Sequence, residues 1–264
     1  MPLSRARLAG IPRRLWRLVS LARHRLLMLD YDGTLAPFRV RRDEARPLPK
    51  SLERLQELSL ADHTHVAIVS GRPVHEVEKL LGALPVSVVG EHGWERRLPS
   101  GEMVRWPVPP RARQVLDAAE SATRELGYGH LLECKRTALV LHTRGLEPAE
   151  SERVQTLGRT LWASFVGGDL VLDRISGGLE IRVRGRNKGT AVLSLLSQAQ
   201  PGTLGTFVGD DVSDEDALEV VQERGFGVRV GGPRGDSVAQ GYLESPHALP
   251  DFLGEWLRVA ARVA

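Results

Sequence analysis

Two aspartates separated by one residue, Asp30 and Asp32, follow the apolar run 26–29. A run this apolar is typical of a strand covered on both faces, so residues at its carboxyl end are expected at the rim of a parallel sheet. Period-two alternation along a strand points both side chains in the same direction. Two like charges so close should divide into one ionised and one more readily protonated group, which suits a nucleophile and a proton carrier.

The same segment is also consistent with a simple loop, because Asp-Gly is frequent in turns and its carboxylates can cap nearby amides. A second acidic segment, 209–216, follows the apolar residues 206–208. The dipole of a helix start explains Asp214 there, but it does not explain Asp210 and Asp211. Carboxylates that converge on one rim repel unless a cation lies among them, and oxygen ligands without histidine or cysteine favour Mg²⁺.

Lys188 stands at the start of a predicted helix, where the helix dipole disfavours positive charge. A local rule broken at the rim of a sheet often marks a functional site. A lysine directed at the acids would keep a nucleophilic carboxylate ionised and neutralise a phosphate oxygen; a solvated lysine is the ordinary alternative. Ser70 and Gly71, at the end of another predicted strand, offer a hydroxyl and an amide to a phosphate oxygen.

These residues need elements to position them, and the first third of the chain alternates strand and helix signals. Apolar strands are predicted at 26–29, 66–69 and 86–89, with helices after Pro49 and Val74 between them, which gives a βαβαβ unit with a parallel sheet. The same pattern returns with a helix at 188–199, a strand at 206–208 and a helix beginning near Asp214.

The middle of the chain differs, with predicted helices at 111–126 and 150–165, a strand at 137–142 and a hairpin of 170–172 with 179–181. We therefore predict an α/β fold, in which a Rossmann-like parallel-sheet core of residues 25–93 and 185–264 is interrupted by a smaller α+β cap domain of residues 94–184. A basic N-terminal arm, residues 1–24, precedes the core.

Composition sets wider bounds. The 264 residues are 42% hydrophobic, enough for one large domain or two smaller ones. Because no apolar run reaches the 18 residues of a membrane span and no signal peptide is evident, we expect a cytoplasmic protein. The single cysteine, Cys134, excludes an internal disulfide and a cysteine-rich metal site.

The basic charge is concentrated at the N-terminus, where residues 1–25 contain seven arginines and no acid. Subtracting these from the net charge of +3 leaves −4 for the rest, so we expect no nucleic-acid partner. Ile11, Leu15 and Val19 recur at helical spacing. Three interpretations of the arm are consistent with this pattern. It is an amphipathic helix that binds a membrane surface or a partner protein, a helix packed on the body of the protein, or an organelle transit peptide.

Four segments, in this order, together resemble the haloacid dehalogenase superfamily of phosphatases. They are Asp30-x-Asp32-Gly-Thr, Ser70 after a strand, Lys188 at a helix start, and Gly209-Asp210-Asp211-x-x-Asp214. The resemblance implies that Asp30 attacks phosphorus to form an aspartyl-phosphate, while Asp32 protonates the leaving oxygen and later activates water. It also implies Mg²⁺ held by the Asp30 side chain, the Asp32 backbone carbonyl and Asp210, with Asp211 or Asp214 supporting through water.

Five further segments make the chain similar to trehalose-6-phosphate phosphatases across nearly its whole length after residue 25. They are Gly90-Glu91-His92-Gly93, Glu95-Arg96-Arg97, Glu133-Cys134-Lys135, His142-Thr143-Arg144 and Leu179-Glu180-Ile181. The resemblance implies that sugar hydroxyls are bound by Glu133, Lys135, Arg144 and Glu180. We also expect substrate contacts from Gly71, Arg72, His92 and Gly93.

The sequence is also consistent with other roles for the cap residues, other substrates and another class of function. Taken singly, the charged residues of the cap are equally typical of a solvated face, and Tyr31 occupies a position that is often apolar or phenylalanine in such enzymes. The substrate is expected to be trehalose 6-phosphate, or another sugar phosphate of the sucrose-phosphate or mannosylglycerate-phosphate type. A function of another class is a docking or regulatory module acting through residues 1–24, bound to a trehalose-phosphate synthase or a membrane surface.

Overall fold

A computed structural model describes residues 7–82, 84–175 and 177–261. These residues form two compact units: a core, which runs up to Val104 and resumes at Asn187, and a cap, Arg105–Arg186. The predicted cap began at residue 94, and that boundary differs from the structure because residues 95–97 pair with the core sheet. A short strand that continues the sheet gives no sequence signal to distinguish it from the start of an insert.

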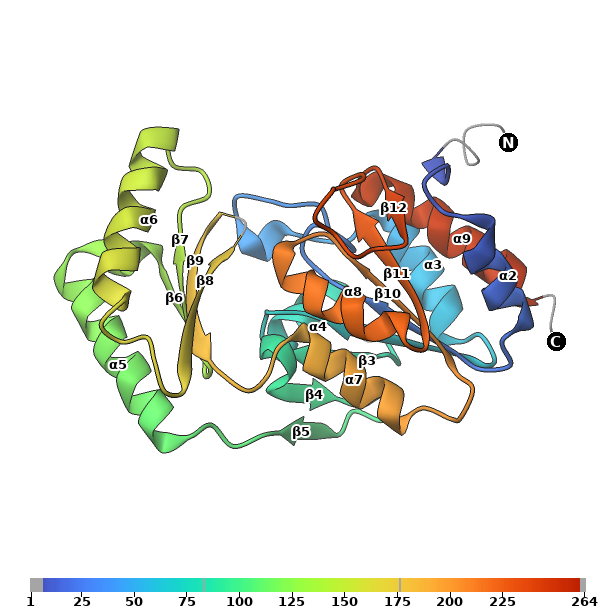
Figure 1. Cartoon of the computed structure of the whole chain (residues 1–264), viewed down its shortest axis with the longest axis horizontal. Coiled ribbons are helices and arrows are strands. Elements are labelled where there is room, and N and C mark those ends of the chain that lie inside the picture. Colours follow the sequence, from blue (N-terminus) through green and yellow to red (C-terminus); the bar gives the residue numbers. More distant parts are fainter. Residues whose placement is uncertain (1–6, 83, 176, 262–264) are drawn as a thin grey trace. The chain divides into compact units, whose positions relative to one another are not determined.

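The core is built on one eight-stranded sheet with the order β12-β11-β10-β1-β2-β3-β4-β5 (Figure 1). The strands are β1 (Arg25–Leu29), β2 (Thr64–Val69), β3 (Ser87–Gly90), β4 (Glu95–Arg97), β5 (Met103–Arg105), β10 (Leu204–Gly209), β11 (Gly225–Val230) and β12 (Gly241–Leu243). The six strands from β12 to β3 are parallel, whereas β4 runs antiparallel to β3. The parallel α/β core is therefore confirmed, and β1 lies at its centre between β10 and β2.

Helices cover both faces of this sheet. They are α2 (Arg13–Leu21), α3 (Pro49–Ser59), α4 (Val74–Leu81) and α9 (Leu249–Ala260) on one face, and α7 (Lys188–Gln198) and α8 (Glu215–Gln222) on the other. Along β1, Leu27 and Leu29 face the first group, whereas Leu26 and Met28 face the second. Burial on both faces is why residues 26–29 of this strand are all apolar, and why acids follow only where the strand ends.

The N-terminal helix packs on the core and is not a detached arm. Leu15 and Val19 of α2 are fully buried, and Trp16 lies against Phe252 of α9 with ring centroids 5.3 Å apart. The guanidinium of Arg25 donates to the carbonyl of Val19, 2.8 Å away. The alternative of a helix packed on the body therefore holds for the described part of the arm; residues 1–6 lie outside the described residues.

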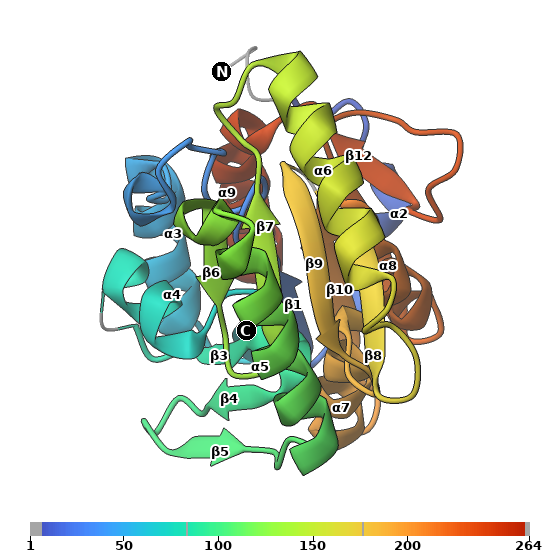
Figure 2. The same cartoon turned by 90° about the vertical axis from the view of Figure 1, so that its left-hand side faces the viewer.

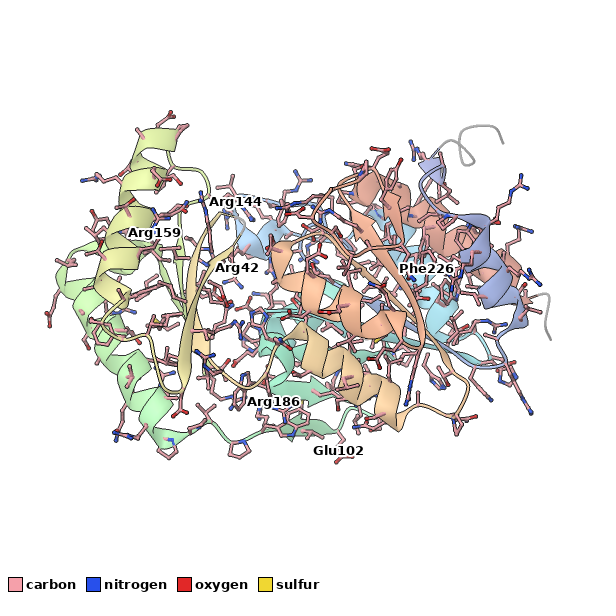
Figure 3. All side chains as sticks on the ribbon, in the orientation of Figure 1. Arg42, Glu102, Arg144, Arg159, Arg186 and Phe226 are labelled. Carbon is pink, nitrogen blue, oxygen red and sulfur yellow. The ribbon has the colours of Figure 1, made fainter. Side chains whose placement is uncertain are left out.

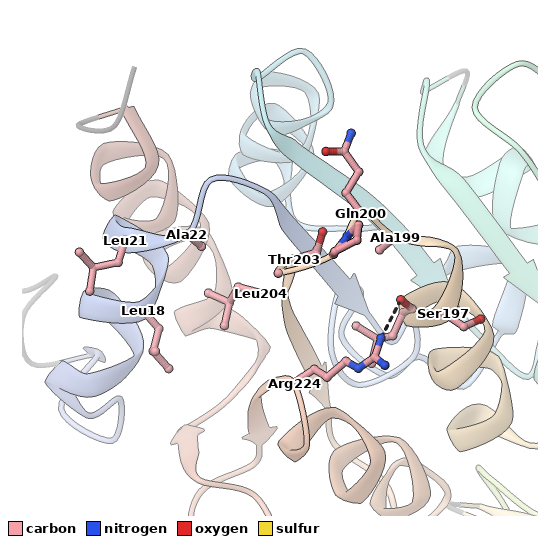
Figure 4. Close-up of a pocket in the computed structure, with 12 residues that line it drawn as sticks. Leu18, Leu21, Ala22, Ser197, Ala199, Gln200, Thr203, Leu204 and Arg224 are labelled. Atoms are coloured by element: carbon pink, nitrogen blue, oxygen red, sulfur yellow. Dashed lines mark hydrogen bonds between the residues drawn. The ribbon is translucent and has the colours of Figure 1, made fainter.

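A pocket of about 660 Å³ lies beside the end of α2 (Figure 4). Leu18 and Leu21 of the helix and Ala22 just after it line the pocket together with the turn 199–204 and Arg224. It is remote in the fold from the carboxyl ends of the strands, because Leu204 begins β10. None of the helices in the described ranges is long and apolar enough to cross a membrane.

The cap is an antiparallel sheet with two helices on one face (Figure 2). Its elements are α5 (Pro110–Glu125), β6 (Leu132–Cys134), β7 (Ala138–His142), α6 (Pro148–Trp162), β8 (Leu170–Ile175) and β9 (Gly178–Val183), with the strand order β6-β7-β9-β8. Gly158 of α6 packs on Leu141 and Leu179, and Trp162 donates from its indole nitrogen to Thr123 of α5. The helices therefore cover the apolar side of the sheet, and the charged residues alternate onto the other side.

Candidate active site

Asp30 lies at the carboxyl end of β1, buried and directly bound to a lysine. The backbone N–H of Asp30 donates to the carbonyl of Val208, which continues the ladder between β1 and β10 for one residue beyond the strand. Its carboxylate then accepts a hydrogen bond of 2.6 Å from Nζ of Lys188. Sequence reasoning placed both residues at the sheet rim, and the structure brings them together.

Lys188 is held at the first position of α7 by its neighbours. Asn187 caps the helix by accepting from the N–H of Thr190 at 2.8 Å, and its amide donates to Asp216 at 2.5 Å. The first contact satisfies a backbone donor of the helix start, and the second brings the carboxylate of Asp216 close to it, which lessens the cost of a positive charge there. Nζ of Lys188 is thereby placed to donate to Asp214 at 2.7 Å as well as to Asp30.

The acidic loop after β10 is organised by Asp214. Its second carboxylate oxygen accepts the N–H groups of Asp210, at 3.0 Å, and of Asp211, at 2.9 Å. Asp210 in turn accepts a 3.1 Å hydrogen bond from the hydroxyl of Thr34. Gly33 permits this approach: it has φ +85°, and a Cβ atom there would collide with the Asp210 carboxylate.

Three carboxylates converge as a result. Ligand atoms of Asp30, Asp210 and Asp214 all lie within 4.8 Å of one another. The side chain of Asp211 instead accepts from the N–H of Val212 at 2.8 Å, so it caps the following turn. Of the acids predicted at the metal site, Asp30, Asp210 and Asp214 form this group, whereas Asp32 and Asp211 do not contribute their side chains to it.

The charges of this cluster do not balance without a cation. Burial and the charge of Asp214 raise the pKa of Asp30 well above its ordinary value, and they raise the pKa of Asp210 to about 7. Burial opposes the charge of Lys188 too, but Asp214 and Asp30 outweigh it and raise the pKa of the ammonium. When all three carboxylates are ionised, they leave a charge of −2 against the one ammonium, which matches a divalent metal with hard oxygen ligands.

Asp32 points to a different partner. Its two carboxylate oxygens accept from Nε and Nη2 of Arg72, both at 2.6 Å. A third nitrogen of Arg72 donates to the carbonyl of Arg42 at 3.0 Å, and the guanidinium lies 5.4 Å from the ring centre of Tyr31. The alternation rule therefore did not predict where Asp32 points, because the strand ends at Leu29 and Asp32 lies in the loop.

Ser70, just after β2, is hydrogen-bonded to the turn that follows β3. The hydroxyl of Ser70 accepts the N–H of Arg72 at 3.1 Å, and its carbonyl accepts the N–H of His92 at 3.1 Å. The ring of His92 lies against Gly71, where any Cβ would meet it at 2.8 Å. Glu91 and His92 have φ +46° and +56°, followed by Gly93 at +101°, a strained backbone of the kind found near functional sites.

In the cap, three of the four predicted sugar-binding residues form one cluster. Nζ of Lys135 lies 3.0 Å from Glu180 and 4.0 Å from Glu133. The other carboxylate oxygen of Glu133 lies 2.7 Å from Nε2 of His142. Arg144, labelled in Figure 3, lies in the turn after β7 against Gly177. All four residues belong to the cap.

Sequence reasoning missed several residues that hold these side chains. Thr34 belongs to the Asp30-x-Asp32-Gly-Thr segment but was given no role, and Arg42 had no signal of its own, because each acts through a loop contact to a distant residue. Asp173 and Arg182 lie one residue beyond the two strands predicted for the hairpin. Arg182 had a usable signal, because it continues the alternation of Glu180 with apolar residues, whereas Asp173 follows the unbroken apolar run 170–172 and had none.

The chain resembles proteins of one family in sequence. A family model described as trehalose-phosphatase matches residues 28–238. A bifunctional trehalose-6-phosphate synthase/phosphatase of Thermoproteus tenax is 35% identical over 216 residues, which cover 80% of this chain and 29% of that protein. A probable trehalose-phosphate phosphatase of Sinorhizobium fredii is 30% identical over 226 residues, 84% of each chain. The chain spans 29% of the length of each of the first two curated relatives it matches.

Solved structures share the fold. The C-terminal domain of Candida albicans trehalose-6-phosphate phosphatase superposes with a TM-score of 0.78 at 24% identity, covering 94% of this chain and 96% of that one. A haloacid dehalogenase-like hydrolase from Bacillus subtilis superposes with a TM-score of 0.62 at 18% identity, covering 87% of this chain and 99% of that one. The fold is that of haloacid dehalogenase-like hydrolases, and the chain belongs to the trehalose-phosphatase family.

Proposed function

We propose that the protein is a Mg²⁺-dependent phosphatase that hydrolyses trehalose 6-phosphate to trehalose and phosphate. The observation that carries the proposal is the buried group of three carboxylates and one lysine at the end of β1, in a chain of this family. In this role Asp30 is the nucleophile, Asp32 the proton carrier, and Lys188 the charge that keeps Asp30 ionised.

The proposed metal site rests on the chemistry of its donors. Asp30, Asp210 and Asp214 supply hard oxygen atoms, and the described residues place no histidine or cysteine among them. Bound Mg²⁺ would neutralise charge on the phosphate oxygens. The protein's own residues do the rest: Lys188 fixes the nucleophilic carboxylate, and Ser70 with the N–H of Gly71 is proposed to bind the phosphate.

The cap is proposed to select the sugar. The Lys135–Glu180 pair is buried, and such a pair stabilises a fold only weakly because both charges lose their water. A donor and an acceptor held in fixed positions can both hydrogen-bond to sugar hydroxyl groups. A ligand without hydroxyls at these positions would leave the two charges without partners and would bind less well. Glu133 and Arg144 are proposed to extend this recognition.

The test is phosphate release from a panel of sugar phosphates with and without Mg²⁺. We expect trehalose 6-phosphate to give the highest kcat/KM and the activity to disappear on treatment with EDTA and return on adding Mg²⁺. If sucrose 6-phosphate or mannosylglycerate phosphate is preferred tenfold, the proposed substrate is wrong and the proposed chemistry stands. Activity that survives removal of all divalent metal would exclude the proposed mechanism.

Metal affinity is expected to depend on pH through Asp210. The folded protein binds a proton at this carboxyl more tightly than the unfolded chain, since burial and Asp214 raise its pKa to about 7. Without metal, the free energy of unfolding should therefore fall as pH rises from about 4 to 7. Mg²⁺ binds only the ionised carboxylate, so its apparent affinity should fall about tenfold from pH 8 to pH 6. Titration calorimetry at both pH values measures this. Asp210→Asn should weaken Mg²⁺ binding and lessen the dependence, part of which stays with Asp30, whose pKa is also raised.

Arg72 is expected to control the rate through Asp32 rather than through substrate affinity. Replacing it in Arg72→Met frees the Asp32 carboxylate to rotate, and kcat should fall by about 10- to 100-fold while KM changes little. Arg72→Lys keeps the charge but loses the contact through two nitrogens, so its kcat should lie between that of the parent and that of Arg72→Met. Arg41→Met is the control for loss of an arginine, because its exposed side chain pairs with Asp43 and Glu44 instead. A raised KM with normal kcat in Arg72→Met would instead support the predicted substrate contact.

A docking role through residues 1–24 is the second candidate. It is favoured by the exposed face of α2, which presents arginines and Leu21, whose surface is 69% exposed. Deleting the segment is a poor test, because Leu15 and Val19 would be lost from the core. Replacing Arg13, Arg14 and Arg17 by serine leaves the core intact; unchanged kinetics with lost binding to anionic vesicles or to a trehalose-phosphate synthase would support this role.

A further inference from the structure

The polar face of the cap sheet carries a row of three acids, one on each of β6, β9 and β8. Glu133 of β6 is in register with Val140 of β7, Val140 with Glu180 of β9, and Glu180 with Asp173 of β8. Residues in register share a face, so the three carboxylates lie in one line. Asp173 is directly opposite Glu180, an arrangement of like charges that destabilises a sheet.

Each of these two acids has its own base, displaced by two residues on the same face. Glu180 is paired with Lys135 at 3.0 Å, and Asp173 with Nε of Arg182 at 2.6 Å. A second nitrogen of Arg182 donates to the carbonyl of Arg186 at 3.1 Å, which fixes the guanidinium. The side chain of Arg182 is only 19% exposed, whereas that of Asp173 is 42% exposed. The arrangement thus holds an accessible acceptor in place with a largely buried donor.

We propose that Asp173 and Arg182 form a second hydroxyl-binding pair beside Lys135 and Glu180, and that together the two pairs recognise a disaccharide. This inference rests on the proposed function and deepens it. Two acid–base pairs at adjacent positions offer two acceptors and two sets of donors along one face, more than a single hexose phosphate needs. A local electrostatic cost accepted on a sheet face is typical of a binding site.

The experiment compares substrates with and without sugar. In Asp173→Asn, kcat/KM for trehalose 6-phosphate should fall five- to twentyfold, while p-nitrophenyl phosphate, which has no sugar, stays within twofold of the parent. Glucose 6-phosphate should be affected less than trehalose 6-phosphate. Arg182→Lys should keep more of the disaccharide activity than Arg182→Met.

Two control variants remove charge from nearby positions outside the row. Asp169→Asn precedes β8, and Arg174→Gln lies on β8 but alternates to the opposite face from Asp173. Both should leave all three substrates within twofold. Asp173→Asn with unchanged trehalose 6-phosphate hydrolysis, or with an equal loss for p-nitrophenyl phosphate, would refute the inference. A parent protein that hydrolyses p-nitrophenyl phosphate but no disaccharide phosphate would refute the proposed function instead.

Discussion

Replacing Asp30 by asparagine is expected to lower kcat by about 10⁴-fold or more, because the amide cannot attack phosphorus. The neighbouring carboxylates are held by other partners: Asp32 by Arg72, Asp210 by Thr34 and Asp214 by Lys188 and two backbone N–H groups. Phosphate monoesters hydrolyse so slowly without catalysis that the loss is measurable over many orders of magnitude. Single-turnover phosphate release, with mass spectrometry for the acyl phosphate, measures it.

The same variant separates catalysis from stability. Burial and the charge of Asp214 raise the pKa of Asp30, so its ionised form costs folding free energy at neutral pH. Without metal, Asp30→Asn should therefore unfold at the same or a higher temperature than the parent. Asp211→Asn is the matched control, since its side chain caps a turn that asparagine also caps. Substantial hydrolysis by Asp30→Asn would contradict the proposed mechanism.

The positions set by strands were predictable from the sequence. Asp30 and Asp210 follow the adjacent strands β1 and β10, and carboxyl ends of adjacent parallel strands meet at one edge. Lys188 was predictable because a lysine at a helix start breaks a local electrostatic rule. In each case the side chain belongs to, or directly follows, an element whose period the sequence shows.

The contacts made by loops were not predictable. Asp32 and Arg72 are 40 residues apart in the sequence, and each lies just beyond the end of a strand. Hydrophobic periodicity says nothing about how such loops turn, and the pairing depends on the carbonyl of Arg42 and the ring of Tyr31 as well. The cap boundary was missed for a similar reason, because β4 has only three residues and no apolar pattern.

Replacing Lys188 by methionine is expected to damage both rate and stability. The ammonium is the charge that pairs with Asp30 and Asp214, and all three groups are buried. Removing one member of a buried ion pair typically costs about 3–5 kcal/mol of unfolding free energy. We expect kcat to fall about 10³-fold as well, since the nucleophile loses the charge that keeps it ionised. Lys79→Met, an exposed lysine of α4, is the control for loss of charge alone.

The pH dependence of Lys188→Met identifies the cause. The pKa of Lys188 is raised by Asp214 and Asp30 despite burial, so in the parent its contribution to stability is constant at neutral and acidic pH. In the variant the carboxylates face one another without a counter-charge and should take up protons as the pH falls. Its loss of stability relative to the parent should therefore be largest near pH 8 and shrink towards pH 5. A loss that is the same at both pH values would mean that packing, rather than charge, accounts for the role of Lys188, and Mg²⁺ should then fail to restore stability at pH 8.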